Sequence, residues 1–305
     1  MIEYLRSTRY SPKIETVEKL SGGSWVRCER PADSELAQLE KLGLDMDIIQ
    51  DALDPHEVPR IEVEGDWTYF ITRVPDVGDN FNDFTTPILF ALHRKYVVTL
   101  SRDSLGRLWQ PFIDTVQVQT VGQTQLFLKM IDTIVLQYQR RVAAINRQMR
   151  AATSNVTNLR SNDIAGITEY ERKLNDYLDA LIPTNTATER LLSGKLLPLS
   201  EDHKDLVEDL SIDLEQVIAR CKSLLRTITN VRDSYRAVMD TKLNETIRLL
   251  TVITLALTIP TMLAGLFGMN VDLPPGSHSP VTFWVIVLVS IIFAASFSLY
   301  FLRKR

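Results

Sequence analysis

The sequence predicts an α+β protein with an N-terminal α/β domain, a long helical stalk and two C-terminal transmembrane helices. Three observations support this fold class. Residues 1–118 contain short apolar runs separated by Gly, Pro and polar turns, residues 199–259 contain neither Gly nor Pro, and two long uncharged runs lie near the C-terminal end. The chain average of 45% apolar and 24% charged residues therefore combines two different regions, a charged N-terminal part and an apolar C-terminal part.

Residues 1–118 are expected to form the α/β domain. Strands are predicted where β-branched and aromatic residues cluster between turn residues, at residues 2–5, 25–28, 60–63, 67–74, 87–92 and 96–100. Two helices are predicted between them. The first runs over residues 33–41 and stops at Gly43, and the second runs over residues 46–53, capped by Asp45 and ended before Pro55.

Residues 119–198 are expected to form long helices that pack against the stalk. Residues 123–165 contain neither Gly nor Pro, and their apolar residues recur at spacings of three and four, which predicts one long amphipathic helix. A second helix is predicted over residues 169–182. Pro183, Gly194 and Pro198 are expected to interrupt the chain before the stalk.

Residues 199–243 are predicted to form a cytosolic stalk helix that continues into the first membrane span. The 61 residues from 199 to 259 could form about 90 Å of helix, which is about three times the thickness of a membrane core. A helix of that length must bury its apolar stripe. We therefore expect it to pack against residues 123–182 and against copies of itself.

Two transmembrane helices are predicted, at residues 244–270 and 281–302, joined by an extracytoplasmic loop at 271–280 and followed by a basic cytosolic tail at 303–305. After Arg248 no charge appears before Asp272, and the 23 uncharged positions can cross a core about 30 Å thick. Lys and Arg flank the hairpin and are absent from its loop. Both termini are therefore expected in the cytoplasm, with the hairpin in the inner (plasma) membrane. The first ten residues lack the apolar segment of a signal peptide, which agrees with this topology.

Composition argues against several classes of function. A net charge of −4 and a pI near 5.7 do not favour nucleic-acid binding. Cys28 and Cys221 lie far apart and form no Cys-x-x-Cys or Cys/His cluster, so we expect buried thiols and not a metal site. The sequence has no phosphate-binding glycine loop, no His-Glu-x-x-His motif and no nucleophile elbow, so no enzymatic activity and no organic cofactor are predicted.

A polar face follows the first span at a spacing of seven residues, divided into three and four. It comprises Asn244, Ile247, Thr251, Thr254, Thr258 and Thr261. One interpretation is a pore-lining face. The other is that the threonines bond their own helix backbone or favour ordinary helix packing. Spacing alone does not separate the two.

The end of this helix favours a pore, although a Gly-x-Asn sequence after a helix is also common as a simple cap. Gly268 allows the backbone to leave the helix, and Asn270 supplies an amide oxygen beside the last exposed carbonyls. Several such helices would form a ring of neutral oxygens, with the partial negative charge of the helix ends at the same mouth. Because Mg²⁺ gives up its water reluctantly, such a ring suits the hydrated ion.

At this point the residues resemble the CorA family of magnesium transporters. Gly268-Met269-Asn270 ends the first of two C-terminal spans and follows a long helix without Gly or Pro. The further matching residues are Asn244-Glu245, Pro260, the segment Asp51-Ala52-Leu53-Asp54, His56, Pro59 and Glu62. The resemblance implies a homopentamer with a funnel of long helices and a pore lined by five copies of the first span.

The resemblance also implies roles for individual residues. The selectivity filter corresponds to Gly268, Met269 and Asn270, the inner polar ring to Asn244, the apolar gate to Ile247 and Leu250, a hydroxyl ring to Thr261 and a cytosolic acidic ring to Asp233. A cytosolic regulatory site for a divalent cation between subunits corresponds to Asp51 and Asp209. Their alternative interpretation is as solvated helix carboxylates.

Three positions depart from the family pattern. Phe267 stands where Tyr is usual, and the outer loop lacks the usual Met-Pro-Glu-Leu, which leaves Asp272 as its only acid. Attraction of cations to the outer mouth should then be weaker. Gln50 stands where relatives often have an acid, which weakens the regulatory site beside Asp51.

The predicted function is a homopentameric membrane channel that passes hydrated Mg²⁺, and also Co²⁺ or Ni²⁺, into the cell down its electrochemical gradient, with cytosolic Mg²⁺ as the gating ion. Its partners are lipid, divalent cations and copies of itself. One alternative is a zinc-transporting relative of the same architecture, against which Met269 favours magnesium. The other is a membrane-anchored helical scaffold or sensor that does not conduct.

Overall fold

The computed structural model describes residues 1–7, 13–75, 84–115, 119–152, 161–269 and 280–303. The chain forms two compact units, Met1–Val231 and Arg232–Arg305. The first unit contains all seven described strands and the packed helices around them. The second contains the C-terminal part of the longest helix and the last helix.

One mixed sheet forms the centre of the first unit, with strand order β2-β1-β3-β7-β6-β5-β4. β3 and β7 are parallel, and the other neighbouring pairs are antiparallel. The strands are β1 (Ile2–Arg6), β2 (Glu15–Val17), β3 (Ser24–Glu29), β4 (Arg60–Glu64), β5 (Trp67–Pro75), β6 (Thr85–Leu92) and β7 (Tyr96–Ser101). The six predicted strands are confirmed to within two residues at each end. β2 was not predicted, because a three-residue edge strand with mostly exposed side chains leaves little pattern.

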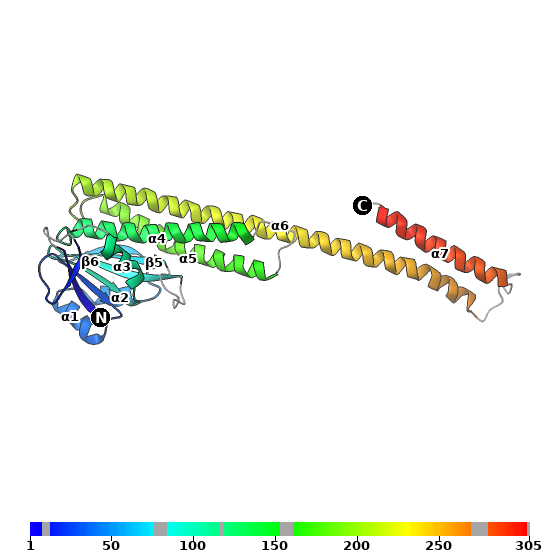
Figure 1. Cartoon of the computed structure of the whole chain (residues 1–305), viewed down its shortest axis with the longest axis horizontal. Helices are drawn as coiled ribbons and strands as arrows, with labels where there is room; N and C mark the ends of the chain where they lie inside the picture. The colour runs from blue at the N-terminus through cyan, green and yellow to red at the C-terminus, as the bar shows by residue number, and fades with distance from the viewer. Residues whose placement is uncertain (8–12, 76–83, 116–118, 153–160, 270–279, 304–305) are drawn as a thin grey trace. The chain divides into compact units, whose positions relative to one another are not determined.

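Helices cover both faces of the sheet (Figure 1). On one face, α1 (Asp33–Lys41) and α2 (Met46–Leu53) enclose a core with Val26, Leu89 and Val98. Both helices were predicted with these bounds. Gly43 follows α1 at a φ of +91°, and the Asp45 carboxylate accepts the N–H groups of Asp47 and Ile48 at 2.8 and 3.2 Å.

The opposite face carries the larger core. It is covered by α3 (Gly106–Thr115), α4 (Gln123–Ala152), α5 (Ser161–Leu191) and the first part of α6 (Glu201–Phe267), of which the last three lie side by side in Figure 1. Trp25 of β3 anchors this core, with its ring edge-on to Trp109 at 5.5 Å and its indole N–H donated to Thr99 at 2.8 Å. α3 was not predicted, although the apolar spacing of Leu105, Leu108 and Phe112 indicates it.

The prediction of one helix over residues 123–165 is wrong. α4 ends at Ala152, and Ser161 already belongs to α5. Residues 153–160 lie outside the described residues, and their sequence is rich in Thr, Ser and Asn, which have low helix propensity. The lack of Gly and Pro was therefore not enough to predict a continuous helix here.

Pro183 does not end the second helix, as was predicted, but lies inside α5. The next residue, Thr184, donates its hydroxyl to the Ala180 carbonyl at 2.7 Å and lies 2.8 Å from the Thr72 hydroxyl of β5. Packing on the sheet holds the helix together where local propensity would break it. The interruption at Gly194 is confirmed, with a φ of +67°.

α6 is a single helix of 67 residues, as the absence of Gly and Pro predicted, and it also contains Pro260. Its apolar positions join the core of α4 and α5 at alternating spacings of three and four, which confirms the predicted packing along these helices. They are Val207, Leu210, Leu214, Val217, Cys221, Leu224 and Ile228. Ser211 adds a hydrogen bond to the side chain of Asn185 on α5 at 3.0 Å.

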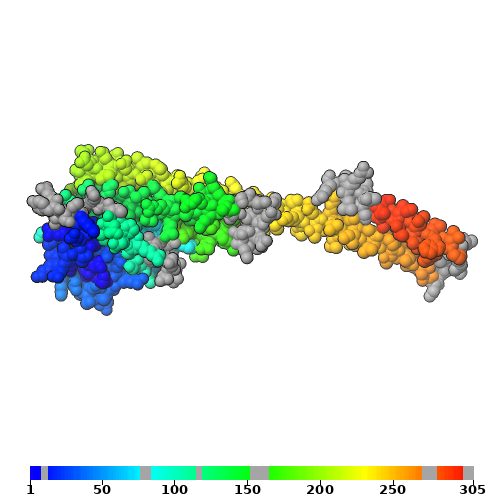
Figure 2. Space-filling view, viewed as in Figure 1, coloured from blue at the N-terminus to red at the C-terminus, as the bar shows by residue number. Residues whose placement is uncertain are grey.

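In the second unit, α7 (Pro280–Arg303) lies beside the end of α6, and Figure 2 shows their surfaces in contact in orange and red. Within the described residues, α6 and α7 are the two helices that are long and apolar enough to cross a membrane. Their apolar side chains are largely exposed, among them Leu257, Trp284 and Ile291. Such exposure suits contact with lipid or with other helices.

Candidate ion pathway

The four threonines of the predicted polar face are all exposed on α6, and all make the same hydrogen bond. Each hydroxyl donates to the carbonyl four residues earlier. Thr251 donates to Ile247 and Thr254 to Leu250 at 2.8 Å. Thr258 donates to Thr254 and Thr261 to Leu257 at 2.7 Å. The backbone bonds named as one interpretation are therefore present, and the oxygens remain on the outer surface of the helix.

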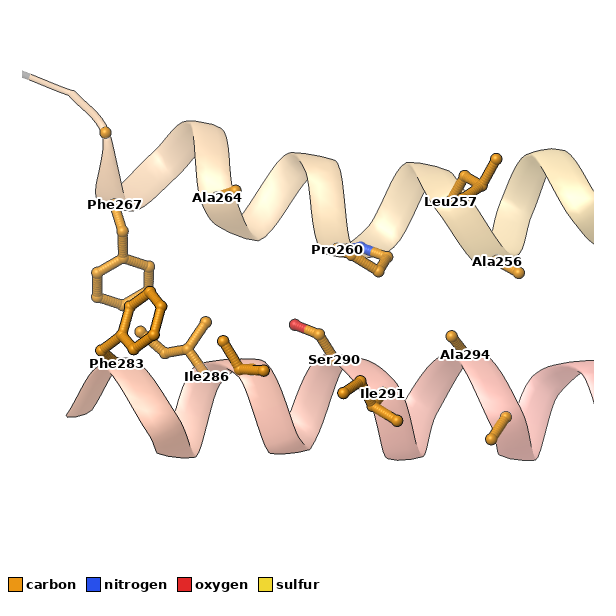
Figure 3. Close-up of a pocket in the computed structure, with 13 residues that line it drawn as sticks. Ala256, Leu257, Pro260, Ala264, Phe267, Phe283, Ile286, Ser290, Ile291 and Ala294 are labelled. Carbon is orange, nitrogen blue, oxygen red and sulfur yellow. The ribbon is translucent and has the colours of Figure 1, made fainter. Parts of the chain in front are cut away.

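α7 packs against a different face of α6. Ala256, Pro260, Ala264 and Gly268, each four residues apart, line a cavity of about 830 Å³ together with α7 (Figure 3). At about 100° per residue, the centre of this face lies about 120° around the helix from the centre of the threonine face. The partner helix within the chain thus leaves the threonines uncovered.

Ser290 of α7 lines the same cavity. It is 7% exposed, and Figure 3 shows its hydroxyl directed toward α6 near Pro260. Pro260 has no N–H, so the Ala256 carbonyl lacks its usual helical partner. Ser290 was not predicted to have a role, because a single serine in an apolar run has no periodic spacing to indicate one.

Of the predicted gate residues, Ile247 lies one turn before Thr251, and Leu250 directly precedes Thr251. Ile247 is 52% exposed and Leu250 is 63% exposed, and Asn244 is exposed on the same helix. Farther toward the first unit, Asp233 is exposed and lies 3.8 Å from Arg236. Helical periodicity places Asn244 and Ile247 on the threonine face, and Leu250 at its edge.

The predicted filter is described only in part. α6 ends at Phe267, and the Gly268 N–H donates to the Ala264 carbonyl at 3.0 Å. A Cβ at Gly268 would lie 3.2 Å from that carbonyl oxygen, so the turn favours glycine. Met269 is half-exposed. Asn270 and Asp272 lie outside the described residues.

Asp51 of the predicted regulatory site is engaged by an arginine of its own chain. The Arg60 guanidinium lies 2.7 Å from the Asp51 carboxylate and also pairs with Glu57 and Glu62. Each of its three nitrogens thus contacts a different carboxylate. Arg60 was not predicted as part of this site, because its separation of nine residues from Asp51 does not indicate that the start of β4 lies beside α2.

Asp209 is exposed on α6 and lines a cavity of about 280 Å³ with Asp213, Lys129 and Asp132. α6 belongs to the core on one face of the sheet and α2 to the core on the other. The fold of one chain therefore does not bring Asp51 and Asp209 together. A site that uses both needs two subunits.

Across the described residues, no group of three or more His, Cys, Asp and Glu side chains is arranged to hold a metal ion. The cysteines are both buried and free. Burial raises the pKa of Cys28 to about 12, with a smaller contribution from the Glu35 carboxylate, and burial raises the pKa of Cys221 to about 12. Neither thiol is a thiolate ligand near neutral pH.

Comparison with known proteins places these features in a family. Residues 21–304 match the model of a family described as CorA-like Mg²⁺ transporter protein. The chain is 24% identical over 288 residues to the cobalt/magnesium transport protein CorA of Methanocaldococcus jannaschii, with 92% of this chain and 90% of that protein covered.

Solved structures show the same fold over the full length. The complete structure of the CorA magnesium transporter from Methanocaldococcus jannaschii matches with a TM-score of 0.85 at 20% identity, covering 100% of this chain and 98% of that chain. The full-length CmaX protein matches with a TM-score of 0.77 at 17% identity, covering 100% and 97%. The α/β domain, the long helix and the C-terminal helices are thus one known architecture.

Proposed function

Because the chain belongs to the family of CorA-like Mg²⁺ transporters, which are not enzymes, we propose that it is a channel for hydrated divalent cations, Mg²⁺ first. It is a membrane protein with two C-terminal spanning helices. The observation that carries the proposal is the position of the four threonines on the face of α6 that α7 leaves free. Mg²⁺, and also Co²⁺ or Ni²⁺, enters the cell down its electrochemical gradient along this face.

One α6 helix cannot enclose a pore, so the proposal includes a homopentamer in which five copies place their threonine faces around one axis. The exposed gate residues Ile247 and Leu250 support this assembly, because a water-filled pathway or other subunits would contact them. The mass of the detergent-solubilised protein by light scattering tests the stoichiometry.

Ions enter at the Gly268 end of α6, where Gly268, Met269 and Asn270 form the filter and Asp272 adds charge to the outer mouth. The close approach of Gly268 to the Ala264 carbonyl supports this role, because it favours glycine directly after the end of α6. The amide oxygen of Asn270 accepts hydrogen bonds from the waters of the hydrated ion. Hydrated Mg²⁺ then passes the threonines, the gate at Ile247 and Leu250, and the rings of Asn244 and Asp233.

Cytosolic Mg²⁺ closes the channel by binding between Asp51 of one subunit and Asp209 of the next. Both carboxylates are exposed and lie on elements that cover opposite faces of the sheet, which suits a site between subunits. The ion competes with Arg60 for Asp51, so binding is weak.

The channel lies in the inner (plasma) membrane with both termini in the cytoplasm. Segment roles follow: residues 1–118 form the cytosolic α/β domain, 119–198 the helices beside the stalk and 199–243 the stalk. The pore helix is 244–270, the outer loop 271–280, the second span 281–302 and the cytosolic tail 303–305. The lack of Lys and Arg in the outer loop supports this orientation.

Purified protein in liposomes tests the function, with influx of Mg²⁺, Co²⁺, Ni²⁺ and Zn²⁺ measured separately. Flux of Mg²⁺ supports the proposal, and flux of Zn²⁺ alone identifies a zinc-transporting relative. The bonds of the threonine hydroxyls to their own backbone favour the second candidate, a helical scaffold or sensor that does not conduct. Absence of flux for all four ions would support that candidate.

A further inference from the structure

We infer that the cavity between α6 and α7 is a binding site for an uncharged, largely apolar molecule that carries a hydroxyl group. The cavity has a volume of about 830 Å³, which is within the range of small-molecule sites. The inference goes beyond ion transport, because it assigns a ligand to a face of α6 that the proposed pathway does not use.

Small and apolar side chains form almost all of the cavity wall. Ala256, Pro260 and Ala264 lie one turn apart on α6, and aliphatic residues of α7 face them. Figure 3 shows the rings of Phe267 and Phe283 at one end of the cavity and small side chains along its middle. Side chains this small leave space between the two helices, so the wall offers an apolar surface to a ligand.

Ser290 is the exception in this wall. Its side chain is 93% buried, because 7% of it is exposed, and its hydroxyl is directed into the cavity toward Pro260 (Figure 3). The threonines of α6 donate their hydroxyl protons to their own helix, but the Ser290 hydroxyl has no hydrogen-bond partner among the described residues. A buried hydroxyl without a partner is costly, so a polar group of a ligand would be favoured beside it.

Pro260 supplies the complementary group. Because proline has no N–H, the carbonyl of Ala256, four residues earlier, lacks its helical donor. Ala256 and Pro260 both line the cavity with Ser290. The site therefore combines a free hydroxyl, which can donate or accept, with a free carbonyl, which accepts. A ligand hydroxyl can donate to the carbonyl and accept from Ser290.

The position of these two groups along the helices determines the kind of molecule. Pro260 is the midpoint of the uncharged run over residues 249–271, and Ser290 lies near the middle of α7. A charged lipid headgroup would be far from water at this depth, and its burial would be very costly. A single hydroxyl costs much less, and the two hydrogen bonds compensate it. The remaining wall suits an alkyl chain, so an apolar alcohol fits the whole site.

A second copy of the chain fits the site less well. The stretch from Arg248 to Asp272 has no charged side chain, and the hydroxyl protons of its threonines on the polar face are already donated within α6. Another α6 would therefore cover the cavity with apolar groups and leave the Ala256 carbonyl without a donor.

Photolabelling of the full-length protein in liposomes tests the site. The probe is an octanol with a diazirine in its alkyl chain, and mass spectrometry locates the adducts. Ser290→Ala removes the hydroxyl, and Ala294→Leu fills the cavity. Ser296→Ala is the matched control, because Ser296 is an exposed serine of the same helix that does not line the cavity. Size-exclusion chromatography checks that each variant assembles like the parent.

We expect adducts of the parent within residues 256–268 and 283–295, and we expect octanol to compete for them more strongly than octane. Labelling should fall about fivefold in Ser290→Ala, which loses one hydrogen bond, and further in Ala294→Leu, whereas Ser296→Ala should match the parent. Absence of adducts in these segments would overturn the inference. Equal labelling of Ser290→Ala and the parent, or equal competition by octane, would also overturn it, because the cavity would then select for apolar surface alone. None of these outcomes depends on ion flux, so the proposed function is tested separately.

Discussion

The guanidinium of Arg60 lies 2.7 Å from the carboxylate of Asp51, so the candidate regulatory carboxylate already has a cation from its own chain. Glu57 and Glu62 complete the group around the same guanidinium. Asp51 is 53% exposed, and an ion pair at such a position contributes about 1 kcal/mol or less. A divalent ion can therefore displace Arg60 at a modest cost.

Replacement of Arg60 should lower the Mg²⁺ concentration needed to protect the protein from proteolysis. In Arg60→Gln, three carboxylates lose their shared counter-ion, so Mg²⁺ no longer has to compete for Asp51. We expect the Mg²⁺ concentration that protects the protein from proteolysis to fall about fivefold, equivalent to about 1 kcal/mol. Arg94→Gln, at another exposed arginine, is the control. If the protective Mg²⁺ concentration in Arg60→Gln is unchanged or higher, Arg60 does not compete with Mg²⁺ at the regulatory site.

Removal of both candidate ligands should have the opposite effect. Two carboxylates on neighbouring subunits repel unless a cation lies between them, so an ion that binds only the closed ring stabilises it. At a hundred times its dissociation constant this stabilisation is about 2.7 kcal/mol per site. Asp51→Ala with Asp209→Ala should lose protection by Mg²⁺ and become insensitive to internal Mg²⁺. Protection that persists in the double variant places the regulatory ion elsewhere.

Ile247 should act as a gate because a dry apolar constriction excludes a hydrated ion. Ile247→Ser allows water to enter this constriction, and we expect Mg²⁺ leak at concentrations of internal Mg²⁺ that close the parent. Leu249→Ser is the matched control, because Leu249 is 53% exposed, like Ile247 at 52%, but lies on the opposite side of the helix. Equal leak in the two variants, or no leak in either, would contradict the assignment of Ile247.

The two buried thiols predict a loss of stability at alkaline pH. The pKa of each is raised from its ordinary 9.0 to about 12 in the folded state, mainly by burial. Below pH 9 both states keep the proton. Between pH 9 and 12 the unfolded thiols ionise and the folded thiols do not, which favours unfolding by about 1.4 kcal/mol per pH unit for each thiol.

Urea unfolding of the first unit, Met1–Val231, within the full chain, followed between pH 8 and 10, measures this loss. Cys28→Ala with Cys221→Ala should show a smaller decline above pH 9. At pH 7.5 the native parent should resist alkylation by iodoacetamide, and the unfolded protein should react. Rapid alkylation of the native protein would contradict the burial of the thiols.

Much of the fold was predictable because its signals are local. Gly43 and Asp45 determine where α1 ends and α2 begins, and both act through their own backbone positions. The absence of Gly and Pro over residues 199–259 predicted the α6 helix, and its length predicted that its apolar stripe would pack against other helices. In the candidate pathway, the seven-residue repeat placed the four threonines on one face for the same reason.

The remaining features depend on contacts between distant residues. Pro183 stays within α5 because Thr184 lies against Thr72 of β5, a relationship that no local pattern contains. Arg60 reaches Asp51 only because β4 begins beside α2. The side of α6 on which α7 lies likewise depends on contacts of α7 with Ala256, Pro260 and Ala264. The sequence of α7 is apolar without clear periodicity, so it does not indicate which side of α6 it packs against.

The most direct test of the central claim is gradient-driven Mg²⁺ uptake into liposomes by the parent protein and by Asn270→Ala, compared at equal protein density and equal oligomeric state. The amide of Asn270 is expected to bind the waters of the ion at the mouth of the pore. We predict Mg²⁺ uptake by the parent and its loss in Asn270→Ala without loss of assembly. A parent that assembles and passes no Mg²⁺ would contradict the account, and normal uptake by Asn270→Ala would contradict its filter.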